Sequence, residues 1–344
     1  MTISPIHPAE TNTDLPTMPP EVVARSTPPA ALDSIDTIEE PRITVGMPLS
    51  EMLLHLSNHG CDDITQDLDK SKCNEYPEWS GGFGEVYRGA LRNGTKVSIK
   101  TLKHINSAEN EGKLFKHAAH ELYIWSKCKH PNILELIGMA QFRNQIAMVS
   151  PWMENGNLQS FLPQHPEVNR CTMCVQISDS ISYLHSQGVV HGDIKGANIL
   201  VSHDYTPKLA DFGNAWWSKG SQSLGFSTTT SNASMSVRWA APELFSGNVP
   251  QGFETDVYAL GMTILEVITG LLPYESLNDF AVFGKIVTKT PPARPESIPS
   301  GIEQADLLWS LLTSCWNPKP EARPTASKVR ERMKVITPEG LRRP

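Results

Sequence analysis

The sequence lacks several features that would place it in a specialised class of protein. Its 344 residues contain no run of about 18 apolar residues, so no membrane span is predicted. The first residues lack the basic segment and apolar run of an export signal. Acidic side chains outnumber basic ones by 37 to 30, and the formal charge of −7 argues against nucleic acid as a partner. We therefore expect a cytoplasmic or nuclear protein, and no pattern indicates its oligomeric state.

The sequence also lacks the paired cysteines of a disulfide framework or a zinc site. Six cysteines are scattered along the chain, and only Cys171 and Cys174 have the spacing of half a metal site. Both lie in a stretch of helical periodicity with Ile177, Ile181 and Leu184, where small thiols are commonly buried. We therefore predict reduced cysteines and a structural role for this pair.

Two segments precede the main domain. Residues 1–45 carry eight prolines among serine, threonine and acidic residues, a composition that predicts a disordered tail. Residues 46–74 form a short lead-in, in which residues 49–57 have the spacing of an amphipathic helix that Gly60 would end. We expect this helix to pack against the domain that follows.

Closely spaced glycines open that domain. Gly81, Gly82 and Gly84 lie in an alternating pattern, followed by a hairpin turn at 93–94 and a strand at 97–100. Glycine lets a backbone approach a ligand closely, so this hairpin predicts a flap over phosphate groups.

Lys100 ends the strand that follows the flap. A charge on an apolar strand is costly unless it is paired. Residues 117–127 have helical spacing and bring Glu121 near this lysine. We predict a Lys100–Glu121 ion pair, with the lysine also reaching two phosphates.

The pattern then changes from strands to helices. Two more strands are predicted, one starting at 130–134 and one over 145–149, before a connector with Pro151 and Gly156. Helical periodicity follows over residues 170–187, 254–269, 303–314 and 325–336. This order predicts an α+β fold with two lobes and a ligand-binding cleft between them.

The clearest chemical pattern lies in residues 191–198 and 211–213. Asp193 and Asn198 are five residues apart, and Asp211 follows before a glycine. Such a loop can supply one base and two magnesium ligands. Phosphoryl transfer requires little more from a protein than positioning and charge neutralisation.

These motifs, in this order, resemble the eukaryotic protein kinase family over residues 75–336, with 337–344 as a C-terminal tail. The resemblance implies a two-lobed kinase fold, with a small strand-rich N-lobe and a larger helical C-lobe. It also implies ATP and Mg²⁺ as cofactors and protein substrates as partners. Asp193 matches the catalytic base, and Asn198 and Asp211 match the metal ligands. The catalytic residues it implies are Asp193, Lys195, Lys100 and Glu121.

The resemblance also assigns an ATP site and an activation segment. The ATP-site positions are Gly81, Gly82, Gly84, Val86, Ser98, Lys100, Ser150, Trp152, Met153 and Leu200. The activation-segment positions are Asp211, Phe212, Gly213, Ser236, Ala241, Pro242 and Glu243. Two further residues match structural positions: Arg323 the partner of Glu243, and Asp256 the carboxylate that holds the catalytic loop.

Lys195 resembles serine/threonine kinases, whereas residues 238–243 and 315–318 look like tyrosine kinases. Both together indicate the tyrosine-kinase-like group of serine/threonine kinases, and a dual-specificity or tyrosine kinase is an alternative. A scaffolding pseudokinase is another, because Trp79 stands where the family usually has its first flap glycine, and Gly192 where it usually has arginine. A small-molecule kinase fits poorly, because the long activation segment suggests a platform for protein substrates.

The arginine that Gly192 replaces normally receives a phosphate on the activation loop. Residues 227–231 are all serine or threonine, so they could be phosphorylated or could simply form a polar loop. Because glycine offers no cation, we hypothesise that basal activity does not need this phosphate.

Overall fold

The computed structural model of the chain describes residues 47–342 except 82–83, 103–107, 219–235 and 248–249. The predicted tail at 1–45, Gly82 and the hydroxyl cluster at 227–231 lie outside the described residues. The helices are α1 Leu49–Asn58, α2 Ala108–Lys127, α3 Leu158–Phe161, α4 Arg170–Ser186, α5 Phe253–Thr269, α6 Asp279–Val287, α7 Glu303–Cys315 and α8 Ala326–Met333. The strands are β1 Trp79–Ser80, β2 Glu85–Ala90, β3 Lys96–Thr101, β4 Gly138–Phe142, β5 Gln145–Pro151, β6 Val189–Val190, β7 Ile199–Val201, β8 Pro207–Leu209 and β9 Trp216–Trp217.

A five-stranded antiparallel sheet forms the N-terminal part, in the order β1-β2-β3-β5-β4. Side chains alternate between its faces, as the pleat requires. Ala147 and Val149 of β5 join one core cluster, whereas Ile146 and Met148 join the cluster that contains α2. Lys100 is the register partner of Met148, so it lies on the face that α2 covers.

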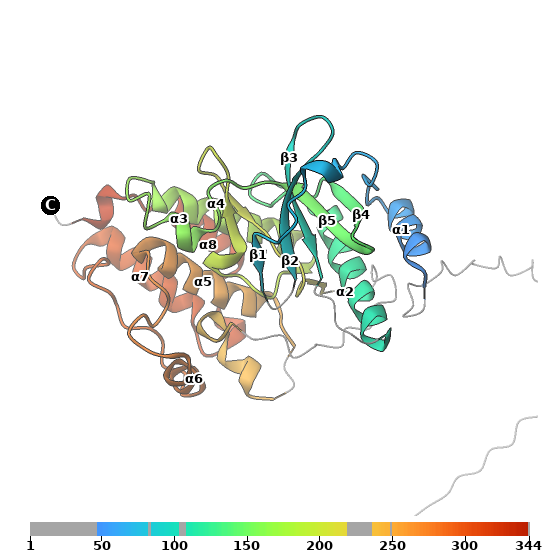
Figure 1. The fold of residues 1–344 in the computed structure, drawn as a ribbon. Coiled ribbons are helices and arrows are strands. Elements are labelled where there is room, and N and C mark those ends of the chain that lie inside the picture. The colour runs from blue at the N-terminus through green and yellow to red at the C-terminus, as the bar shows by residue number, and fades with distance from the viewer. Residues whose placement is uncertain (1–46, 82–83, 103–107, 219–235, 248–249, 343–344) are drawn as a thin grey trace, which may run out of the picture. The chain divides into compact units, whose positions relative to one another are not determined.

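Helices dominate the C-terminal part (Figure 1). α4 packs against α5 and α8, and α5 also packs against α7. α5 is buried almost all round, which explains its strongly apolar sequence. None of the helices in the described ranges is long and apolar enough to cross a lipid bilayer.

Several local predictions are confirmed. α1 forms where an amphipathic helix was expected, and it packs against α2 and β5. Cys171 and Cys174 are buried on α4, and all six cysteines are free thiols. Burial raises the pKa of Cys171 to about 11.

One strand prediction is wrong. Residues 130–134 contain a single bridge, from Ile133 to Leu209, and the strand β4 begins only at Gly138. Ile133 and Leu134 are apolar because they are buried beside the C-terminal part, and no ladder forms there. The helices α3 and α6 were not predicted.

Candidate active site

One buried cation joins three elements of the fold. The Lys100 Nζ of β3 donates to Glu121 Oε1 of α2 at 2.7 Å and to Asp211 Oδ1 at 2.7 Å. The Glu121 side chain is 4% exposed and the Asp211 side chain 25%. The predicted Lys100–Glu121 pair is therefore present, and the structure adds Asp211 to it.

The three groups perturb one another's protonation. Burial alone would lower the pKa of Lys100, but Asp211 and Glu121 together raise it. Burial also opposes ionisation of Asp211, yet Lys100 overcomes this effect and lowers the pKa of Asp211. Burial raises the pKa of Glu121, because Lys100 only partly offsets the cost of burying its charge. The more deeply buried carboxylate therefore holds its charge less easily.

Phe212 holds Asp211 in this position. Its side chain is fully buried, stacked on Trp125 of α2 at 5.9 Å and edge-on to His191 at 5.3 Å. Asp211 has a φ of 67°, a region that residues other than glycine seldom occupy. Packing of the next residue therefore maintains an unfavourable backbone conformation that presents the carboxylate to Lys100.

The predicted catalytic loop forms a closed network of hydrogen bonds. Lys195 Nζ donates to Asp193 Oδ2 and to Ser236 Oγ, both at 2.7 Å, and Ser236 Oγ donates to Asp193 Oδ1 at 2.8 Å. Asn198 Nδ2 donates to the Asp193 Oδ2 at 2.8 Å and also to the Asp193 backbone oxygen. The structure thus gathers a carboxylate, a cation, an amide and a hydroxyl at one point.

Two buried carboxylates of α5 accept hydrogen bonds from the backbone of this loop. Asp256 accepts hydrogen bonds from the backbone N–H groups of His191 at 2.8 Å and Gly192 at 2.9 Å. Glu266 accepts hydrogen bonds from the Gly196 N–H and the Trp239 indole, both at 3.0 Å. Burial raises the pKa of Glu266, although these donors partly offset the rise.

Sequence reasoning missed Glu266. Its signal was a glutamate inside the apolar run at 254–269, where an unpaired charge is costly. Asp256 was predicted to hold the catalytic loop, and the structure places its carboxylate against that loop.

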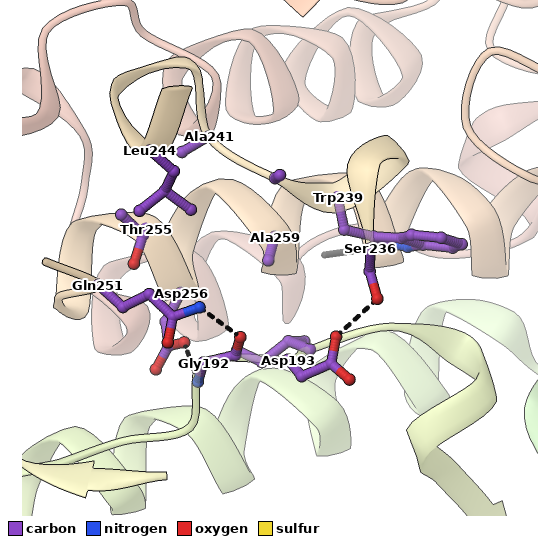
Figure 2. Close-up of a pocket in the computed structure, with 12 residues that line it drawn as sticks. Gly192, Asp193, Ser236, Trp239, Ala241, Leu244, Gln251, Thr255, Asp256 and Ala259 are labelled. Carbon is purple, nitrogen blue, oxygen red and sulfur yellow. Dashed lines mark hydrogen bonds between the residues drawn. The ribbon is translucent and has the colours of Figure 1, made fainter. Parts of the chain in front are cut away.

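Gly192 lies at the edge of a pocket between the loop and α5 (Figure 2). Its φ is 79°, which favours glycine, and a Cβ there would collide with the Gln251 side chain and lie 2.9 Å from Asn214 O. Gln251 Nε2 donates to the Gly192 carbonyl at 3.0 Å, as the dashed line in Figure 2 shows. A neutral side chain therefore holds the loop at Gly192, the position where the resemblance noted a glycine in place of the usual arginine.

The far end of the activation segment is fixed by an ion pair. Arg323, whose side chain is fully buried, donates from Nη2 to Glu243 Oε2 at 2.8 Å and from Nη1 to Glu254 O at 3.0 Å. This is the Arg323–Glu243 pair that the resemblance implied. Ala241 and Pro242, just before Glu243, are buried as well.

The ATP-site positions lie along the N-terminal sheet and just beyond it. Val86 is opposite Lys100, and Ser98 is opposite Ser150. The Gly81 N–H donates to Gly84 O at 3.0 Å, so these two described flap residues are hydrogen-bonded to each other.

The remaining members of this set lie near the connector. Leu200 bridges to Asn157, and Met153 packs against the main core. Trp152 carries Arg88 over its ring at 5.2 Å. Trp79 is 56% exposed, with its ring against Gly81.

Comparison with known proteins identifies the class that this fold and site define. Residues 79–333 match the protein tyrosine and serine/threonine kinase family. The match covers most of the chain, which therefore belongs to the protein kinase family.

Similar proteins include kinases with different printed specificities. The L-type lectin-domain containing receptor kinase I.3 of Arabidopsis thaliana is 30% identical over 72% of this chain and 39% of its own. The serine/threonine-protein kinase STY17 of the same plant is 28% identical over 83% and 48%. The tyrosine-protein kinase FRK of Homo sapiens is 27% identical over 73% and 48%. The chain thus spans less than half the length of these relatives.

The family generally uses Mg²⁺ with ATP, and the residues present fit that ion. Magnesium prefers oxygen ligands and commonly takes one or two carboxylates together with phosphates. Asn198 turns its amide nitrogen to Asp193, so its side-chain carbonyl oxygen would be the atom to bind the ion, and Asp211 would offer a carboxylate. Ala210 N–H donates to Asn198 O at 2.9 Å and keeps the two segments together. Within the described ranges, no group of three or more His, Cys, Asp or Glu side chains could hold a metal ion.

The Tm of the Glu121→Gln variant should rise relative to the Tm of the wild type as the pH increases from about 4 to 7. The pKa of Glu121 in the folded state lies above its unfolded value of about 4.3. The protonated side chain therefore contributes stability to the wild type at pH values below the unfolded pKa. This stability is lost as the pH rises through the folded pKa. The glutamine variant does not titrate, and Lys100 keeps Asp211 as its partner.

Calorimetry across this pH range measures the difference. Glu154→Gln is the matched control, because Lys96 lowers the pKa of that exposed carboxylate and the pH dependence should have the opposite sign. A Tm for Glu121→Gln that falls relative to wild type as the pH increases would contradict the prediction.

Proposed function

We propose that the chain is an active serine/threonine protein kinase of the tyrosine-kinase-like group. The observation that carries this proposal is the position of Lys195, whose ammonium contacts both Asp193 and Ser236. A cation there can steady a transferring phosphate beside the base. The serine/threonine kinase STY17 among the relatives supports this specificity, whereas the tyrosine kinase FRK keeps the tyrosine or dual-specificity alternative open.

In the proposed reaction, Asp193 orients the acceptor hydroxyl and takes its proton while the hydroxyl oxygen bonds to the γ-phosphorus and ADP leaves. Lys100 binds phosphate oxygens, and Lys195 stabilises charge on the transferred group. Asn198 and Asp211 would hold Mg²⁺, which would neutralise charge on the phosphate groups. Asn198 also fixes the Asp193 carboxylate by donating to it.

Two features favour catalysis over a scaffolding pseudokinase. Lys100 is engaged with both Glu121 and Asp211, so the phosphate-binding group and a metal ligand are aligned with each other. The Asp193 carboxylate keeps three hydrogen-bond donors, which fix its orientation as a base that receives a proton requires.

The pocket in Figure 2 contains Asp193 and Ser236 and continues along Trp239, Ala241 and Leu244. The activation-segment residue Ser236 therefore lies directly beside the proposed base, to which its hydroxyl donates a hydrogen bond.

We also propose that the protein works in a reducing compartment, the cytoplasm or the nucleus. All six cysteines are free thiols, and five of them are buried.

Asp193→Ala should lower the rate of phosphate transfer from Mg²⁺-ATP to a generic protein substrate by roughly 10²–10⁴. Asp211→Asn should also be strongly impaired, because it weakens both the metal site and the contact with Lys100. Phosphoamino-acid analysis of the wild-type product should show phosphoserine and phosphothreonine. Equal incorporation by wild type and Asp211→Asn, or stabilisation by ATP without turnover, would favour the scaffold; phosphotyrosine alone would overturn the specificity.

Replacing the hydroxyl residues at 227–231 with alanine should leave basal activity within about twofold of wild type. Gln251→Leu should reduce activity more, by up to roughly tenfold, because it removes the hydrogen bond that holds Gly192. Steady-state kinetics on protein freed of phosphate by a phosphatase measures both. Loss of activity in the alanine variant, with its fold intact, would show that a loop phosphate is required.

A further inference from the structure

The region before the family match is part of the structural core. The match begins at residue 79, whereas Met52, Leu56 and Cys61 are each at most 1% exposed. They belong to the same cluster of buried residues as Leu122 of α2. α1 lies beside α2 in Figure 1, and the two helices are in contact.

α1 and the residues after it are tied to α2 at two further points. Cys61 Sγ donates to the backbone oxygen of Leu122 at 3.7 Å, a weak hydrogen bond within a buried contact. Lys127, the last residue of α2, donates from Nζ to His59 O at 2.6 Å. The same ammonium lies 5.3 Å from the centre of the Tyr123 ring. The second half of α2 is therefore connected to this segment by apolar packing, a hydrogen bond and a charged contact.

The same segment is anchored to the sheet. Ile64 N–H donates to Met139 O and Met139 N–H donates to Asp62 O, both at 2.8 Å. These bonds cover β4, which lies at the edge of the sheet and would otherwise expose unpaired backbone groups. A Cβ at Gly138 would lie 2.5 Å from Asp62 O, so glycine is what permits this close approach.

Residues 47–68 therefore connect the sheet that carries Lys100 with the helix that carries Glu121. The Lys100–Glu121 contact requires those two elements to keep a fixed relative position, and Leu122, beside Glu121, is fully buried in the shared cluster. We propose that α1 is a positioning element that holds α2 where Glu121 reaches Lys100. The kinetic part of this proposal rests on the proposed kinase function.

α1 offers a matched pair of variants. Leu56 is fully buried against the core, whereas Leu54, two residues away on the same helix, is 63% exposed. Leu56→Ala should loosen the packing of α1 against α2. Leu54→Ala changes the same residue type and leaves that packing intact. Lys127→Gln provides a milder second variant, because it removes the charged contacts to His59 O and the Tyr123 ring at the surface and leaves the apolar packing of α1 intact.

Hydrogen exchange of the full-length wild type and variants tests whether α1 holds α2 in place, and it does not require the protein to be active. Leu56→Ala and Lys127→Gln should accelerate amide exchange in residues 115–127 of α2 and leave α4 and α5 at wild-type rates. Leu54→Ala should match wild type throughout. Exchange that increases equally in α2, α4 and α5, or that changes in no variant, would overturn the proposal, because α1 would then add only general stability or nothing.

Kinetics in two backgrounds tests whether the effect runs through Glu121. At a temperature well below every Tm, Leu56→Ala should lower kcat about tenfold in the wild-type background and less than about twofold when Glu121→Gln is already present. Lys127→Gln should show the same pattern with a smaller effect. Equal losses in both backgrounds would overturn the proposal. A wild-type protein without turnover would refute the proposed function, and the exchange measurements would still decide the role of α1.

Discussion

The site depends on one ammonium group that two carboxylates share. Lys100 neutralises only one of the two negative charges of Glu121 and Asp211, and all three groups are substantially buried. Buried ion pairs add little net stability, because desolvation offsets most of the attraction, whereas breaking one leaves an unpaired charge. The arrangement is thus better explained as a device for alignment than as a source of stability. It holds only while the sheet, α2 and the segment at 211–213 keep their positions, so packing far from the chemistry controls it.

The catalytic loop is also held by buried carboxylates, but here their partners are backbone N–H groups instead of a cation. Much of this loop lies outside regular helices and strands, so its buried N–H groups need acceptors from elsewhere. Asp256 and Glu266 supply them from α5, a helix that is mostly buried. Each carboxylate accepts more than one hydrogen bond, which makes its burial tolerable. The same hydrogen bonds join the loop to the most buried helix, and this fixes where Asp193 points.

Sequence patterns revealed the parts whose chemistry is written locally. Lys100 was found because a charge interrupts an apolar strand, and the loop at 191–198 because its polar residues are closely spaced. Glu266 and Gln251 act only through residues distant in the chain, so local spacing held no sign of their partners. The false strand at 130–134 has the same origin: Ile133 is apolar because of a tertiary contact with Leu209, and propensity does not separate that case from a strand. The helix at 49–57 was predicted correctly, but its contact with α2 was not assigned a role.

Gly192 is held in place by its backbone conformation and by a neutral hydrogen bond. A residue other than glycine at its φ of 79° would cost about 1 kcal/mol or more, and its side chain would displace Gln251. The neutral bond from Gln251 to the Gly192 carbonyl holds the loop without any added charge. A charge-assisted lock depends on phosphate and weakens with salt, whereas an amide–carbonyl bond beside a buried carboxylate depends on neither. Since α1 is likewise a permanent part of the chain, both constraints on the site are built into the fold itself.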